Sequence, residues 1–448
     1  MIRTTTSPLR QPGAVLLVSC YELGHQPLGV AWPKAFLERA GFTPAVVDLS
    51  LDPLSEAQVR DARVAVIAVP MHTALRLGVR AAERIRRINP DCPIVFTGLY
   101  ALLNADYLRA HGATAVLGGE FEAELVALLE AFELPRPASP VPRPTLERLD
   151  FPVPSRSGLP PLTRYVKLEH RGRLVPVGYV EASRGCLHEC LHCPIPPVYG
   201  GRFFAVPHEV VLEDIRRLIA AGAGHITFGD PDFLNGPGHA RRLVRALHAE
   251  FPDVTYDFTA KIEHLLEHQA MLPEFAATGC LFIVSAVESL SDVVLGHLEK
   301  GHSRADVVRA LGAVREAGLA LRPTFIPFTP WSTREDYLDT LDFVEGEGLI
   351  GHVDPVQYSI RLLVPPGSLL LSRPALRSFL GRVDPAAFTY RWMHPDPGMD
   401  ALHRSVSAAV ADGARFVDVR VLAGQPARAW EPPPERPIPA RLTEPWFC

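Results

Sequence analysis

This 448-residue chain lacks the features that would assign it to a membrane or to nucleic acid. Its longest apolar runs, such as residues 14–18 and 64–69, are as long as a strand and far too short to span a bilayer. The net charge of −5 leaves no basic excess for binding nucleic acid. The seven cysteines do not form a secreted disulfide framework, and no secretory signal precedes them. We therefore expect a cytoplasmic globular protein with reduced thiols.

Proline is the residue in excess, and its distribution indicates how the chain is divided. Nine of the 44 prolines fall within residues 135–161, a pattern typical of an extended linker. The length of the chain allows two or three domains with cores of their own. The domains that we predict are an α/β domain over residues 1–134, the linker over 135–161, a second α/β domain over 162–370, and a C-terminal cap with an extended tail over 371–448.

The first domain alternates short β-rich runs with amphipathic helical patterns, which is typical of a doubly wound parallel sheet. The expected strands are 14–20, 45–49, 64–69, 94–97 and 115–117. We predict a flavodoxin-like order, in which ligands bind at the carboxyl ends of the strands. The candidate cofactor-binding residues at those ends are Tyr21, Gly24, Gln26, His72, Thr73, Gly98, Gly118, Gly119 and Glu120.

The second domain repeats strand and helix patterns in the order of a partial (βα)6 TIM-type barrel. Its expected strands are one that ends at 183, followed by 225–230, 255–260, 281–289, 321–328 and 356–363. Catalytic residues of such barrels gather at the carboxyl ends of the strands. The polar residues expected there are Asp230, Asp232, Lys261, Glu288, Ser289 and Arg361. An Asp at a strand end is also a common helix N-cap, so position alone leaves both roles open.

Three cysteines lie in one loop, Cys186-Leu-His-Glu-Cys190-Leu-His-Cys193, directly after the first strand of this domain. Thiolates spaced C-x₃-C-x₂-C can bind three irons of a 4Fe–4S cluster and leave the fourth iron without a protein ligand. An open coordination position is typical of a catalytic site. The alternative is a zinc knuckle with His188 or His192 as fourth ligand, although no second C-x₂-C pair is present. A disulfide is favoured less than either.

The cysteine loop resembles the start of a radical S-adenosylmethionine (SAM) enzyme. This resemblance implies that the open iron binds SAM and that the reduced cluster cleaves it to methionine and a 5′-deoxyadenosyl radical. It places SAM-binding residues in Phe228-Gly-Asp-Pro-Asp232, in Glu288-Ser289, and near Arg361 on a late strand, with Glu288 and the three cysteines as the catalytic set. It also implies an electron donor, such as a flavodoxin or ferredoxin, as a partner.

The first domain is similar to the cobalamin-binding domain that precedes the barrel in the B12-dependent branch of these enzymes. The D-x-H-x-x-G motif that supplies a histidine to cobalt is absent, because the spacing around His25 does not match it. The resemblance therefore implies cobalamin held without a histidine ligand, with the His72 loop near its lower face. The alternative is a flavodoxin-like domain that binds no cofactor.

The chain ends in Leu442-Thr-Glu-Pro-Trp-Phe-Cys448, which looks like the approach to the tail of the CUAEP/CCAEP-tail radical SAM family. The second chalcogen residue and the Ala-Glu-Pro of that tail are missing. A selenocysteine codon read as a stop would end the chain at Cys448. The alternatives are a natural truncation and a frayed terminus that carries an unrelated cysteine. A dichalcogen tail would favour a soft element such as arsenic(III) or a redox role.

These resemblances imply a radical SAM enzyme that transfers an alkyl fragment to a small-molecule substrate. The first hypothesis is cobalamin-dependent methyl transfer. The alternative is transfer of the 3-amino-3-carboxypropyl group of SAM to a soft element such as arsenic(III). A non-enzymatic iron–sulfur or cobalamin sensor is a third hypothesis, but a sensor does not need an open iron position.

Overall fold

The first domain is a parallel sheet with helices on both faces. The computed structural model describes residues 7–134, 143–426 and 439–444. The strands of this sheet are β1 (Val15–Ser19), β2 (Ala45–Asp48), β3 (Val64–Ala68), β4 (Ile94–Thr97), β5 (Ala115–Gly119) and β6 (Pro144–Thr145). Their order, β2-β1-β3-β4-β5-β6, confirms the flavodoxin-like prediction and adds β6 from the predicted linker.

Helices cover the sheet because its central strands are apolar throughout. Every residue of β1, β3 and β5 is buried, as expected for parallel strands packed on both faces. The helices are α1 (Leu28–Arg39), α2 (Glu56–Asp61), α3 (His72–Ile88), α4 (Leu99–Leu103), α5 (Ala105–Ala110) and α6 (Glu122–Phe132).

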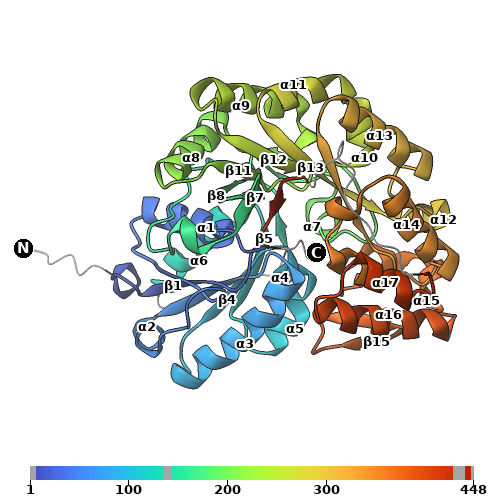
Figure 1. Ribbon diagram of the computed structural model, residues 1–448. Coiled ribbons are helices and arrows are strands. Elements are labelled where there is room, and N and C mark those ends of the chain that lie inside the picture. The colour runs from blue at the N-terminus through green and yellow to red at the C-terminus, as the bar shows by residue number, and fades with distance from the viewer. Residues whose placement is uncertain (1–6, 135–142, 427–438, 445–448) are drawn as a thin grey trace, which may run out of the picture.

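The second domain is a curled, mostly parallel sheet in the order β14-β13-β12-β11-β8-β7-β17 (Figure 1). Its strands are β7 (Lys167–His170), β8 (Arg173–Val180), β11 (His225–Phe228), β12 (Thr255–Thr259), β13 (Cys280–Glu288), β14 (Ala320–Phe325) and β17 (Arg441–Leu442). The helices around it are α7 (Pro196–Tyr199), α8 (His208–Ala220), α9 (Pro237–Glu250), α10 (Ile262–Glu267), α11 (Leu272–Ala277), α12 (Asp292–Leu298), α13 (Arg304–Glu316) and α14 (Arg334–Gly346). The predicted partial barrel is confirmed as a half-barrel.

The sixth predicted barrel strand, residues 356–363, is not formed. A 3-10 helix occupies Pro355–Ser359, and only Arg361 pairs, through one parallel bridge to Phe328. The side-chain oxygen of Gln357 accepts a hydrogen bond of 3.0 Å from the backbone N–H of Phe325. This side chain therefore satisfies a donor of β14 that a sixth strand would have used.

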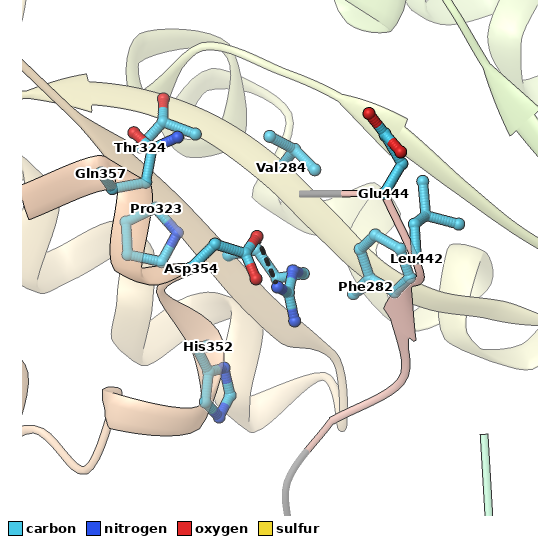
Figure 2. Close-up of a pocket in the computed structure, with 10 residues that line it drawn as sticks. Phe282, Val284, Pro323, Thr324, His352, Asp354, Gln357, Leu442 and Glu444 are labelled. Carbon is cyan, nitrogen blue, oxygen red and sulfur yellow. Dashed lines mark hydrogen bonds and ion pairs between the residues drawn. The ribbon is translucent and has the colours of Figure 1, made fainter. Parts of the chain in front are cut away.

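The C-terminal tail returns to the half-barrel. Strand β17 pairs antiparallel with β7, and β7 pairs antiparallel with β8, so the tail runs in the same direction as β8. Leu442 packs with residues of β8 and β13. Figure 2 shows Leu442 and Glu444 at a small cavity, together with Phe282 and Asp354. Asp354 forms an ion pair with Arg322, which also lines the cavity. Cys448 lies outside the described residues.

The segment between the half-barrel and the tail forms a cap beside the first domain. It contains α15 (Pro374–Arg377), the hairpin β15 (Leu380–Asp384) and β16 (Thr389–Trp392), α16 (Pro397–Ala411) and α17 (Phe416–Leu422). The short hairpin of β9 (Ser183–Gly185) and β10 (Phe203–Ala205) carries the cysteine loop. No helix within the described ranges is both long and apolar enough to cross a membrane.

Candidate functional site

The cysteine loop begins directly after β9, at the carboxyl end of the half-barrel. Backbone contacts hold the loop: the Leu191 N–H donates to Leu298 O at 3.0 Å, and the Cys193 N–H to Cys190 O at 3.1 Å. All three thiols are free. Burial raises the pKa of Cys186, and it raises that of Cys193 to about 12. Burial therefore favours the protonated form of Cys186 and Cys193, and a bound metal would have to displace these protons.

The described side chains of the cysteine loop do not have the spacing of a zinc knuckle. Tetrahedral zinc with Zn–S bonds of about 2.3 Å holds its sulfurs about 3.8 Å apart. In the described part of the chain, only His188, Asp232 and His264 bring three possible ligand atoms within 4.8 Å of one another. No such group includes a cysteine, so the arrangement disagrees with a zinc knuckle.

Two buried polar atoms next to the loop have no partner among the described residues: Asn235 Nδ2 and His192 Nδ1. The other polar atom of the Asn235 side chain, Oδ1, accepts a hydrogen bond of 3.2 Å from the Leu187 N–H of the loop. His192 uses its Nε2 on Glu288 Oε1 at 3.1 Å. A buried polar atom without a partner is costly, so both atoms are available to a group bound at the loop.

Glu288 forms a buried charge network across the loop. Its carboxylate contacts Lys300 Nζ at 3.3 Å as well as His192 Nε2. Burial alone would raise the pKa of Glu288, but the Lys300 ammonium and the His192 imidazole outweigh it and hold that pKa at about 2. Glu288 also has φ of 65° at an irregular point of β13. Such strain in a non-glycine residue costs about 1–3 kcal/mol and is typical of functional positions.

The two predicted aspartates have different surroundings. Asp230 accepts hydrogen bonds from Ser183 Oγ at 2.5 Å and from the Ala182 N–H at 2.9 Å, and burial raises its pKa to about 7. Asp230 therefore fixes the segment that leads into the cysteine loop. Asp232 caps the 3-10 helix at Phe233–Asn235, and its Oδ2 lies 2.8 Å from His264 Nδ1.

Ser289 and Arg361 are engaged in local structure. The Ser289 hydroxyl oxygen accepts from the Ser291 N–H at 3.1 Å, just before α12. The Arg361 guanidinium pairs with Asp400 at 2.7 Å and stacks 3.5 Å from the ring centre of Trp392. Arg361 thus anchors the C-terminal cap to the half-barrel.

The predicted cofactor residues of the first domain make contacts within the protein itself. Tyr21 donates to Glu444 at 2.6 Å, Gln26 contacts Arg156 and Pro160, and His72 Nε2 lies 2.6 Å from Ala387 O. Thr73 is exposed. The glycines pack against the protein itself: a Cβ on Gly98, Gly118, Gly119 or Gly24 would meet Val69, Leu102, Thr145 or Glu444.

Sequence reasoning missed Arg184 on β9, one of the residues that join the two domains. Its guanidinium lies 2.7 Å from Glu122 and 3.9 Å from Glu120 of the first domain, and 3.0 Å from Glu181. The Tyr199 hydroxyl, just after the cysteine loop, also donates to Glu120 at 3.1 Å. The charged step Ser183-Arg-Gly185 before the loop was the only signal for this contact. Lys300 and His264 were likewise missed, because nothing in the sequence pairs them with Glu288 or Asp232.

Comparison with known proteins identifies the half-barrel. Residues 180–344 match the Radical SAM superfamily, so the chain contains a radical SAM domain, which confirms the prediction of an enzyme of this type. A cluster and SAM are the cofactors of that superfamily. A tRNA-2-methylthio-N(6)-dimethylallyladenosine synthase of Desulfosudis oleivorans is 29% identical over 47% of this chain and 44% of its own length. A hopanoid C-3 methylase of Methylococcus capsulatus is 25% identical over 68% of this chain and 62% of its own length.

Solved structures support the arrangement of the whole chain. The cobalamin-dependent SAM radical enzyme OxsB, with aqua-cobalamin bound, has a TM-score of 0.68 at 15% identity over 92% of this chain and 71% of OxsB. The radical SAM methyltransferase TsrM of Kitasatospora setae has a TM-score of 0.66 at 18% identity over 90% of each chain. These similarities show the fold. This chain spans less than half the length of the first curated relatives that it matches.

Proposed function

We propose that this protein is a radical SAM methyltransferase that uses a 4Fe–4S cluster and cobalamin to methylate a small molecule. The observation that carries the proposal is the contact between the carboxyl edge of the first sheet and the segment that follows the cysteine loop. Helix α4 and strand β5, at the carboxyl edge of the first sheet, contact α7, which follows the cysteine loop. The solved relatives with this arrangement include one with bound aqua-cobalamin and one described as a methyltransferase.

The residues of the chain have separate tasks in this proposal. Cys186, Cys190 and Cys193 hold the cluster, and the unpartnered Asn235 Nδ2 is a donor toward it. When bound, the reduced cluster supplies the electron that cleaves SAM, and cobalamin supplies the methyl carrier. Glu288 stays ionised at neutral pH because Lys300 and His192 hold its pKa low. It can therefore accept hydrogen bonds from the amino group or the ribose of SAM.

Arg184 keeps the two cofactor regions in register. It is enclosed by carboxylates of both domains and lies near the rings of Trp32 and Phe151. Because it sits on β9, immediately before the cysteine loop, it ties the edge of the first sheet to the start of that loop. Methyl transfer between two cofactors needs such a fixed distance, since a small displacement of reacting groups is costly in rate.

The first test is the cluster. Full-length protein reconstituted anaerobically with iron and sulfide should contain about four irons per chain and show the visible absorption of a cluster. The variant with all three loop cysteines changed to Ala should lose both. Cys92→Ala, at a buried free cysteine of the first domain, is the matched control and should keep both. A triple variant that retains its iron would contradict the assignment.

The second test identifies the reaction by its SAM-derived products. Incubation with SAM, dithionite and cobalamin should yield 5′-deoxyadenosine, methionine and S-adenosylhomocysteine. Aminocarboxypropyl transfer would instead leave methylthioadenosine, and a sensor would consume no SAM. Full-length protein should also retain cobalamin on gel filtration, and its cobalt(II) form should show no coupling to an imidazole nitrogen. Absence of retained cobalamin would favour a first domain without a cofactor. A flavodoxin or ferredoxin is the expected electron donor in place of dithionite.

A further inference from the structure

A cluster of two histidines and an aspartate lies next to the cysteine loop. His188 comes from the loop itself, Asp232 follows β11, and His264 lies on α10. The Nε2 atoms of His188 and His264 face each other at 3.1 Å. On the far side of the His264 ring, Nδ1 lies 2.8 Å from Asp232 Oδ2. The proposed cluster and SAM roles use neither histidine.

The carboxylates around the two rings favour protons on their outer nitrogens. Asp232 accepts from His264 Nδ1, so that nitrogen carries a proton, and in the neutral ring the lone pair is on Nε2. The carboxylate of Glu263 lies 3.7 Å from His188 Nδ1. If His188 is also protonated at Nδ1, two lone pairs point at each other across 3.1 Å. That arrangement is repulsive, and it is relieved either by a proton on one Nε2, which makes the contact a hydrogen bond, or by a metal ion that both lone pairs bind.

The separation of the nitrogens suits two ligands of one metal ion. Zinc binds imidazole at about 2.0–2.1 Å, which puts two adjacent nitrogens about 2.9 to 3.4 Å apart for angles between octahedral and tetrahedral. A metal-bound histidine commonly donates its other N–H to a carboxylate, as His264 does to Asp232. The nearby Lys261 ammonium, which would repel a cation, is paired with Glu263 at 3.0 Å.

We propose that His188 and His264 bind a divalent metal ion of the zinc type through their Nε2 atoms, with Asp232 orienting His264. Imidazole ligands favour zinc and the late first-row metals over magnesium or calcium. With two protein ligands, the ion keeps positions open for water or for a donor atom of a small molecule. Because His188 lies two residues from both Cys186 and Cys190, a substrate with a carboxylate, phosphate or thiolate would be held beside the cysteine loop.

Zinc binding to the full-length, cluster-reconstituted protein tests this proposal. After anaerobic dialysis against Zn²⁺, elemental analysis should find one zinc per chain in addition to the iron. His264→Ala should weaken zinc binding at least tenfold, and Asp232→Asn should weaken it about 10- to 100-fold. His268→Ala is the matched control, because it removes a histidine whose ring lies 5.8 Å from that of His264 but is not a proposed ligand. It should leave zinc binding unchanged, and unchanged iron in every variant will show that the fold persists.

Zinc-edge X-ray absorption of the unmodified protein supplies a readout that needs no variant. The proposal requires nitrogen and oxygen scatterers near about 2.0 Å and no sulfur near about 2.3 Å. Sulfur scattering would place the zinc on the cysteines and overturn the proposal. Absence of bound zinc would also overturn it and leave a proton shared between the two rings. These measurements do not use SAM cleavage, so their result is independent of the proposed methyl transfer.

Discussion

Lys300→Met tests whether the buried charges of Lys300 and Glu288 stabilise each other. The Lys300 side chain is 3% exposed and that of Glu288 10%, with 3.3 Å between Nζ and Oε1. Removing the ammonium leaves a buried carboxylate with only His192 as partner. The difference between the usual pKa of 4.5 and the pKa of about 2 for Glu288 in the folded protein corresponds to about 3 kcal/mol of stability at neutral pH. Breaking a buried ion pair from one side typically costs about 3–5 kcal/mol, so we expect a loss in that range.

The loss of stability in Lys300→Met should depend on pH. Because the pKa of Glu288 is depressed on folding, its stabilisation is present above about pH 4.5 and is lost as the pH falls toward about 2. Without Lys300, burial raises that pKa, so the carboxylate should take up a proton on folding. The stability of Lys300→Met should therefore improve relative to the unmodified protein as the pH is lowered from 7.5 to 5.

Urea unfolding of the full chain, followed by tryptophan fluorescence, measures these differences. The double variant Glu288→Gln/Lys300→Met removes both charges and should be destabilised less than the sum of its single variants, because neither charge is left buried alone. Two results would refute the reasoning. One is a Lys300→Met variant that loses less than about 1 kcal/mol, and the other is a double variant whose loss equals the sum.

Three further changes test other parts of the structure. Asp230→Ala leaves Ser183 Oγ and the buried N–H of Ala182 without a partner, so it should lower the unfolding free energy by about 1–3 kcal/mol. It should also lower the amount of iron bound on reconstitution. A normal iron content would show that the cysteine loop forms without Asp230. His25 is buried and stacked 4.4 Å from Tyr179, and burial lowers its pKa to about 3. Because the imidazole is protonated more easily in the unfolded chain, stability should fall as the pH drops below about 6.5. His25→Phe should reduce this fall, as measured by urea unfolding at pH 7.5 and 5. Gly229→Ala would put a Cβ 2.2 Å from the Tyr179 ring, so the midpoint of thermal unfolding should be clearly lower. An unchanged midpoint would mean that Tyr179 moves aside without cost.

Much of the fold could be predicted because it depends on local patterns. Apolar runs such as residues 64–69 and 281–289 became buried strands, and their order matched the predictions of a flavodoxin-like sheet and a partial barrel. The sixth barrel strand was wrong, since no local pattern shows that the Gln357 side chain takes the place of a strand partner. Strand β17 was also missed, because two residues in a proline-rich tail carry no periodic signal.

The sequence by itself determined the cysteine loop, because the spacing of Cys186, Cys190 and Cys193 is a local property that survives in any fold. Only the tertiary structure decided which polar groups meet: Arg184 with Glu122, Glu288 with Lys300, and His188 with His264. Each pair joins different elements of the chain, and its geometry depends on how the sheets curl and pack. The energy of a buried charge depends on its partner within a few ångströms, and sequence position does not encode that distance.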